Sequence, residues 1–117
     1  MLFMLIVKES QNAEAGQLPP NHLMEAMDRF NEALIEANVR VMAKGLHPSS
    51  NALRITYPIP DGDPVITQGP FEDPQHIIAG FILIDVTDKE EAIRWALKMP
   101  DPQGFGEGQI ELRQVFE

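Results

Sequence analysis

"LFMLIV" at residues 2–7 is an unbroken apolar run with the length of a β-strand. Successive side chains of a strand point to opposite faces of its sheet, so a run without a polar residue needs apolar cover on both faces. "GFILIDV" at residues 80–86 is a second run of this kind. Together the two runs predict a sheet whose central strands are covered on both sides.

An amphipathic helix is expected between these runs, over residues 21–38. Its apolar residues recur at spacings of three and four and form one stripe: Leu23, Met27, Phe30, Leu34 and Ala37. The opposite side is charged: Glu25, Asp28, Arg29, Glu32 and Glu36. Asn38 is suited to end the helix because asparagine tolerates the left-handed conformation found there.

A strand is expected after this helix, because Val39, Val41 and Ala43 alternate with Arg40, Met42 and Lys44. The stretches "ALRITY" and "VIT", joined by "PIPDGDP", then predict a hairpin that turns at Asp61-Gly62.

A second helix is expected over residues 88–99. Thr87 or Asp88, with Glu90 or Glu91 three residues on, forms overlapping capping boxes, and Pro100 stops the helix. The alternating "QIELRQVF" near the end of the chain predicts a closing strand.

The resulting order is β-α-β, a hairpin, and β-α-β in a single domain, residues 1–117. This order predicts an α+β fold, a ferredoxin-like (split βαβ) antiparallel sheet with two helices on one face. Two helices cover only one side, and the other would expose more than the few hundred Å² of apolar surface usual for a soluble monomer. The simplest cover is the same face of a second copy, which predicts a homodimer through the sheet face.

The composition excludes several classes of function. With 18 acidic against 9 basic residues the net charge is −9, which argues against direct nucleic-acid binding. No apolar run approaches the ~20 residues of a membrane span, and the N-terminus lacks the features of a signal peptide, so we expect a cytoplasmic protein without membrane association. The absence of cysteine rules out disulfides and thiolate metal sites.

The stretch "TQGPFEDPQHIIAG", residues 67–80, is the first candidate site. Its Gly69-Pro70-Phe71 segment is explained by turn chemistry alone, in which Gly and Pro set the backbone and Phe71 anchors the loop. Gln68 and Asp73 flank this turn, so an amide and a carboxylate on a loop held by the sheet could meet a ligand. A solvated loop is the alternative.

His47 is the candidate catalytic residue, because an imidazole with an ordinary pKa near 6.5 exchanges protons at neutrality. The alternative is a histidine hydrogen-bonded to its own loop. The neighbouring Ser49 and Ser50 lack the Gly-x-Ser-x-Gly setting of a nucleophilic serine. Arg54 could bind an anionic ligand or pair with a surface acid.

Metal and cofactor sites are not expected. His22, His47, His76 and Asp73 include no pair at a recognised ligand spacing, and no Gly-rich phosphate loop is present.

Five segments together resemble the YCII-related family in its DGPF-motif branch: "MLIVKES", "GLHPSSNALRI", "TQGPF", "IAGFILIDVTDKEEAIRWALKMP" and "GEGQIELRQVFE". The resemblance implies a ferredoxin-like dimeric α+β barrel. One family relative is similar to a dehydrochlorinase of a chlorinated hydroxyhydroquinone with a His and Asp pair for acid–base work, and some members are fused to or encoded near sigma factors.

The family motif Asp-Gly-Pro-Phe becomes Gln68-Gly69-Pro70-Phe71 here, so a neutral amide replaces the motif carboxylate. Asp73 matches an acid that usually follows. His22 could match a histidine that opens the first helix in the other branch, but the acid expected late in the second helix falls at Met99. The resemblance thus implies ligand-binding roles for Gln68, Phe71, Asp73 and His22, with an incomplete His and Asp pair. Arg54 joins these ligand-binding residues because of its charge.

Two functions remain open. The first is a dimeric α+β barrel that binds a small organic molecule near Gly69-Pro70-Phe71 and performs acid–base, lyase- or isomerase-like chemistry with His47. The second is a non-catalytic dimerisation or regulatory module, favoured by the missing motif carboxylate. The residues do not determine whether the protein is an enzyme.

Overall fold

The computed structural model of the chain describes residues 1–10, 14, 20–104 and 106–117. Its elements are β1 (Leu2–Lys8), α2 (Asn21–Glu36), β2 (Arg40–Gly45), the 3-10 turn η1 (Ser49–Asn51), β3 (Leu53–Thr56), β4 (Val65–Gln68), the 3-10 turn η2 (Pro74–His76), β5 (Ile78–Asp85), α3 (Lys89–Lys98) and β6 (Ile110–Gln114). Each strand, helix and hairpin predicted above is present among them.

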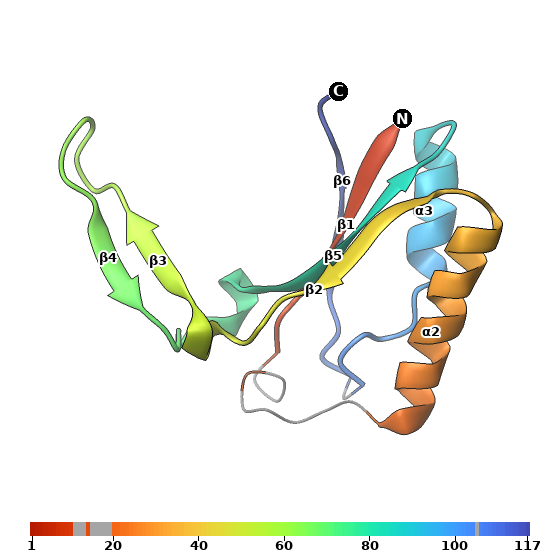
Figure 1. Cartoon of the computed structure of the whole chain (residues 1–117), viewed down its shortest axis with the longest axis horizontal. Coiled ribbons are helices and arrows are strands. Elements are labelled where there is room, and N and C mark those ends of the chain that lie inside the picture. The colour runs from red at the N-terminus through yellow and green to blue at the C-terminus, as the bar shows by residue number, and fades with distance from the viewer. Residues whose placement is uncertain (11–13, 15–19, 105) are drawn as a thin grey trace.

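Four strands form an antiparallel sheet in the order β2-β5-β1-β6. Because β1 and β2 both pair antiparallel with β5, they run parallel to each other with β5 between them. Helix α2 connects β1 to β2, α3 connects β5 to β6, and both lie on the same side of the sheet (Figure 1). The predicted α+β fold with an antiparallel sheet and two helices is confirmed.

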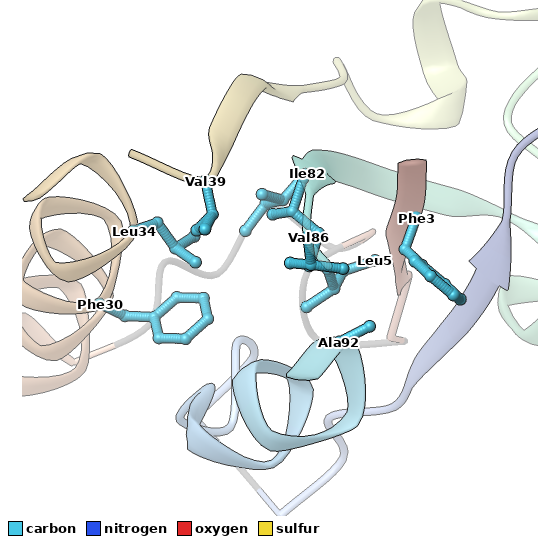
Figure 2. Close-up of a cluster of buried hydrophobic side chains, with 9 residues drawn as sticks. Phe3, Leu5, Phe30, Leu34, Val39, Ile82, Val86 and Ala92 are labelled. Carbon is cyan, nitrogen blue, oxygen red and sulfur yellow. The ribbon is translucent and has the colours of Figure 1, made fainter. Parts of the chain in front are cut away.

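The core lies between the helices and one face of the sheet (Figure 2). It is made of Phe3, Leu5, Phe30, Leu34, Val39, Ile82, Ile84, Val86 and Ala92. The other face of the sheet carries apolar residues that are at most partly buried: Met4, Ile6, Met42, Phe81 and Leu83. We call this second surface the open face. The central strands are therefore apolar on both sides, as their sequences predict, and a single copy covers only one of them.

Helix α2 buries Phe30 and Leu34 of the predicted stripe, but Ala37 is exposed because the helix has already ended. Asn38 adopts a left-handed φ of 60°. Its N–H donates to the carbonyl of Ile35 (2.9 Å), and the N–H of Val39 donates to the carbonyl of Leu34 (3.1 Å). These two bonds form a Schellman motif, so the predicted role of Asn38 is confirmed.

Helix α3 begins after Asp88, whose side chain accepts a 2.8 Å hydrogen bond from the backbone N–H of Glu91. The Glu91 carboxylate in turn accepts hydrogen bonds from the N–H (3.0 Å) and hydroxyl (2.8 Å) of Thr87. These bonds hold the pKa of Glu91 below its ordinary value. The predicted cap from Asp88 to Glu91 is therefore formed, whereas Thr87 bonds to Glu91 instead of the predicted Glu90.

Strand β2 differs from its predicted alternation. The pairing of β2 with β5 shifts between Arg40 and Met42, so Val41 is bulged out and 53% exposed. Arg40 lies opposite Ile84, a core residue, and Ala43 lies opposite Ile82. The prediction that Val39, Val41 and Ala43 share one face was wrong, because the bulge places Arg40 on the helix-covered face.

The predicted hairpin is formed by β3 and β4, which pair only with each other. Its turn is closed by a 2.9 Å bond from the N–H of Gly62 to the carbonyl of Ile59, with Asp61 at a left-handed φ of 58°. The hairpin projects away from the side of the sheet that the helices cover (Figure 1). Among the described residues, no helix is long and apolar enough to cross a membrane.

Candidate functional site

The Gly69-Pro70-Phe71 loop joins β4 to β5 and is tied to η1. The N–H of Gly69 donates to the carbonyl of Ala52 (2.9 Å), and the N–H of Phe71 donates to the hydroxyl of Ser49 (2.9 Å). The Gly69-Pro70 peptide bond is cis. The loop is therefore fixed by backbone bonds, which supports its predicted structural role.

Ser49 is the centre of these bonds and is only 2% exposed. Its hydroxyl donates to one carboxylate oxygen of Glu14 (2.6 Å), and its backbone N–H donates to the other (3.0 Å). Ser49 thus joins three segments that are distant in sequence, at Glu14, η1 and Phe71. These bonds make Ser49 a structural link between the loop and the rest of the chain.

Arg54, Phe71 and Asp73 come together, as three of the predicted ligand-binding residues. The guanidinium of Arg54 forms a 3.3 Å ion pair with Asp73 and lies 4.1 Å from the centre of the Phe71 ring. Both charged side chains are about one-third exposed, so the pair contributes modestly to stability. The charge of Arg54 is already matched by an internal acid.

The other predicted site residues stand apart. His47 and Gln68 are exposed, and His22 is exposed in the first turn of α2. Across residues 1–10, 14, 20–104 and 106–117, no hydrogen bond or ion pair engages these three side chains. A general base needs an oriented partner, and a single copy gives His47 none within this part of the chain.

Glu9, at the end of β1, lies beside Glu14. Burial raises the pKa of Glu9, a weak hydrogen bond from the N–H of Ser10 (3.4 Å) opposes the shift, and the charge and side-chain hydrogen bond of Glu14 raise the pKa further. When it is protonated, the Glu9 carboxyl donates to Glu14, the same group that holds Ser49.

Glu9→Gln is expected to raise the thermal midpoint by a few degrees at pH 7 and to give no gain at pH 4. The folded state favours protonated Glu9, so its contribution is present below the unfolded pKa and is lost as the pH rises through the raised folded value. A glutamine keeps a donor toward Glu14 at every pH. Thermal melts between pH 4 and 8 measure the difference.

The control for this change is Glu25→Gln, which removes the same charge from the exposed side of α2. Equal stabilisation by both variants would contradict the local pairing, because it would reflect only the reduced net charge.

A cavity of about 380 Å³ lies between α2, strands β2 and β5, and the loop after α3. Its wall includes apolar side chains such as Met27, Ala43 and Ile82, together with Gln103. Gln103 is 7% exposed and donates from Nε2 to the carbonyl of Lys8 (3.0 Å). None of the predicted site residues lines this cavity.

Two polar groups in this cavity wall are unsatisfied. The Nε of Arg40 and the Oδ1 of Asn31 are buried and have no hydrogen-bond partner among the described residues. The Nδ2 of Asn31 donates to the carbonyl of Met27 (3.2 Å), which orients the amide. A buried donor and acceptor without partners are uncommon, since each costs about 1–3 kcal/mol.

Sequence reasoning missed Arg40 and Asn31 for two reasons. The bulge at Val41 turns Arg40 from the face that alternation predicts to the opposite one. Asn31 follows Phe30 at the border of the apolar stripe, where a polar residue gives no signal. The sequence feature that could have indicated this site is an arginine within a strand that directly follows a helix.

The loop after α3 is shaped by Asp101. Its carboxylate accepts hydrogen bonds from the N–H groups of Gln103 (3.1 Å) and Gly106 (2.9 Å). Burial acts to raise the pKa of Asp101, but bonds from the backbone N–H groups of this loop outweigh it and hold the pKa below its ordinary value. These bonds stabilise the side of the Arg40 cavity that Gln103 forms.

A second, wide cavity of about 650 Å³ is acidic, with Glu9, Glu72 and Glu107 in its wall. Within the described ranges, no group of three histidine, aspartate or glutamate side chains is placed to hold a metal ion. This cavity therefore supports no metal centre.

The model of the YCII-related domain family matches residues 1–117. No curated protein matches the sequence significantly.

Proposed function

Because the chain belongs to the YCII-related domain family, we propose that it is a homodimeric protein that binds a small organic anion in the Arg40 cavity. The observation that carries the proposal is that Arg40 and Asn31, each of which has a buried polar atom without a partner among the described residues, line the same cavity.

The chemistry of these groups defines the ligand class. A guanidinium presents planar donors that match a carboxylate, and the amide of Asn31 adds a polar group to the same cavity wall. The volume of about 380 Å³ is at the lower end of small-molecule sites, and the wall is largely apolar. A hydroxylated aromatic or short aliphatic carboxylate fits this description.

The proposal includes a finer fold assignment, which the topology supports. The order β2-β5-β1-β6 with both helices on one side supports a ferredoxin-like sheet, and Gln68-Gly69-Pro70-Phe71 supports membership of the DGPF branch. The open face, with Met4, Ile6 and Leu83 at its centre, supports a dimeric α+β barrel in which a second copy covers it.

Acid–base chemistry is the extension of this function. In this proposal His47 is the proton-transfer residue, and Gln68, Phe71, Asp73, Arg54 and His22 are ligand-binding residues that act after dimerisation or ligand binding orders them. Support comes from the assembly of Arg54, Phe71 and Asp73 in one loop cluster.

Benzoate, 4-hydroxybenzoate and neutral benzamide test the ligand class by calorimetry and thermal shift. Both carboxylates are expected to bind, and to stabilise the protein by about 2.7 kcal/mol at a hundredfold excess over Kd, whereas benzamide does not bind. Arg40→Met should weaken carboxylate binding by about 10- to 100-fold, as expected for the loss of a hydrogen bond to a charged group.

The matched control is Arg29→Met, which removes an exposed arginine from α2 and should leave binding unchanged. Arg40→Met should melt no lower than the wild type, because it removes a buried donor that has no partner. Equal affinity in the two variants would refute the cavity as the site. A loss of binding in His47→Ala alone would move the site to the loop.

A non-catalytic dimerisation or regulatory module is the second candidate, and the open face favours it. It predicts a stable dimer that binds none of these carboxylates and retains a protein partner through the Gly69-Pro70-Phe71 loop. Loss of that partner in a pull-down with Phe71→Ala would support this function.

A further inference from the structure

We infer that the hairpin, residues 53–68, is an arm that packs its apolar face onto the open face of a second copy of this chain. The inference rests on the proposed homodimer and adds the contact that would hold it together.

The two faces of the hairpin differ in polarity. Residues paired across an antiparallel ribbon share a face, so Ile55 lies beside Ile66 and next to Leu53, whereas Arg54 lies beside Thr67 and next to Thr56. We call the face with Ile55, Ile66 and Leu53 the apolar hairpin face; Gln68, opposite Leu53, is the polar residue at its base. Ile55, Ile66 and Leu53 are 48%, 61% and 52% exposed, respectively.

The polar face is the one that contacts its own chain. Arg54 is bound to Asp73 and stacked on Phe71 at the base of the hairpin, which fixes the direction in which the ribbon faces. The apolar face therefore points away from this anchor. A two-stranded ribbon with an uncovered apolar face is marginally stable in water, so it needs a partner.

Charge complementarity identifies the partner surface. The charged side chains on the four strands of the open face are Lys8, Lys44, Arg113, Glu111 and Asp85, and Asp85 is already paired with the N-terminal ammonium. The remaining charges leave this face positive in a protein whose net charge is −9. The tip of the hairpin carries Asp61 and Asp63, both exposed.

The apolar hairpin face, with its acidic tip, thus complements the open face, which is apolar and carries a net positive charge. In the single chain the hairpin projects away from the rest of the molecule, and its apolar face is uncovered (Figure 1). A two-fold axis brings the hairpin of each copy to the open face of the other, so both exposed surfaces are covered in one closed dimer. Anionic membranes are disfavoured as the partner because they repel the acidic tip and the net negative charge.

The test measures dimer dissociation by sedimentation equilibrium. Ile55→Ser with Ile66→Ser is expected to raise the dimer Kd at least tenfold. The matched control is Val65→Ser, since Val65 is the neighbour of Ile66, is 51% exposed and lies on the polar face with Thr56. Its dimer Kd should stay within twofold of the wild type. Circular dichroism verifies that all variants remain folded.

Leu83→Asp, in the centre of the open face, separates failure of the arm from failure of the dimer. If Leu83→Asp is monomeric while the Ile55 and Ile66 variant dimerises as tightly as Val65→Ser, the arm is refuted and the dimer stands. A wild-type protein that remains monomeric even at a concentration 100-fold above the micromolar range overturns both the arm and the homodimer. A wild-type monomer whose hairpin becomes protected only on vesicles overturns the choice of a second copy.

Discussion

Gly69→Ala is expected to lower the free energy of unfolding by about 4 kcal/mol, since overpacking against fixed backbone and the loss of nearby hydrogen bonds add together. A Cβ at this position would overlap the carbonyl oxygen of Ser49 and lie 2.7 Å from its carbonyl carbon. The obstacle is main chain, so no side-chain rotation can relieve it. Relief requires the loop to move away from η1, which breaks the bonds from Gly69 to Ala52 and from Phe71 to Ser49.

Urea unfolding of the variant beside Gly45→Ala measures this effect. A Cβ on Gly45, at the end of β2, meets no atom within 4 Å, so this control should change stability by less than about 1 kcal/mol. Similar losses in both variants would contradict the steric argument. A loss confined to local hydrogen exchange in residues 49–71, with no change in global unfolding, would show that the loop detaches without weakening the core.

The fold could be predicted because its signals are local. "LFMLIV" and "GFILIDV" are apolar on both faces and form β1 and β5 at the centre of the sheet, and Phe30 and Leu34 repeat at helical spacing and enter the core. Asn38 and Asp88 specify their helix ends through bonds to residues within five positions. Periodicity and capping chemistry contain this information in short windows of sequence.

The candidate site depends on contacts that no short window contains. Ser49 is bound by Glu14 and Phe71, which lie 35 and 22 residues away, so its burial has no local signature. Arg40 reaches the helix-covered face only through the bulge at Val41, and alternation predicts the opposite face. Sequence reasoning did identify Phe71 and Asp73 from their turn and Arg54 from its charge, but it could not foresee that Arg54 on β3 reaches both of them.

Ser49→Ala is expected to lower the free energy of unfolding by about 3 kcal/mol, because a hydrogen bond to a charged group is worth about 1.5–3 kcal/mol and an unpaired buried donor costs about 1–3 kcal/mol more. The substitution removes the 2.6 Å bond to Glu14 and leaves the N–H of Phe71 without its acceptor at 2.9 Å. Ser49 is 2% exposed, so water cannot readily replace the hydroxyl. Urea unfolding at pH 7 provides the measurement.

Ser50→Ala is the matched control, since Ser50 is the exposed neighbour in the same 3-10 turn and should change stability by less than about 0.5 kcal/mol. A double-mutant cycle with Glu14→Gln then separates the two bonds of the hydroxyl. If Ser49 acts through Glu14, the coupling energy should reach about 1 kcal/mol or more, as for residues within one hydrogen-bond network. Additive losses would instead assign the effect of Ser49 to Phe71 alone, and equal losses at Ser49 and Ser50 would exclude the link between the loop and η1 altogether.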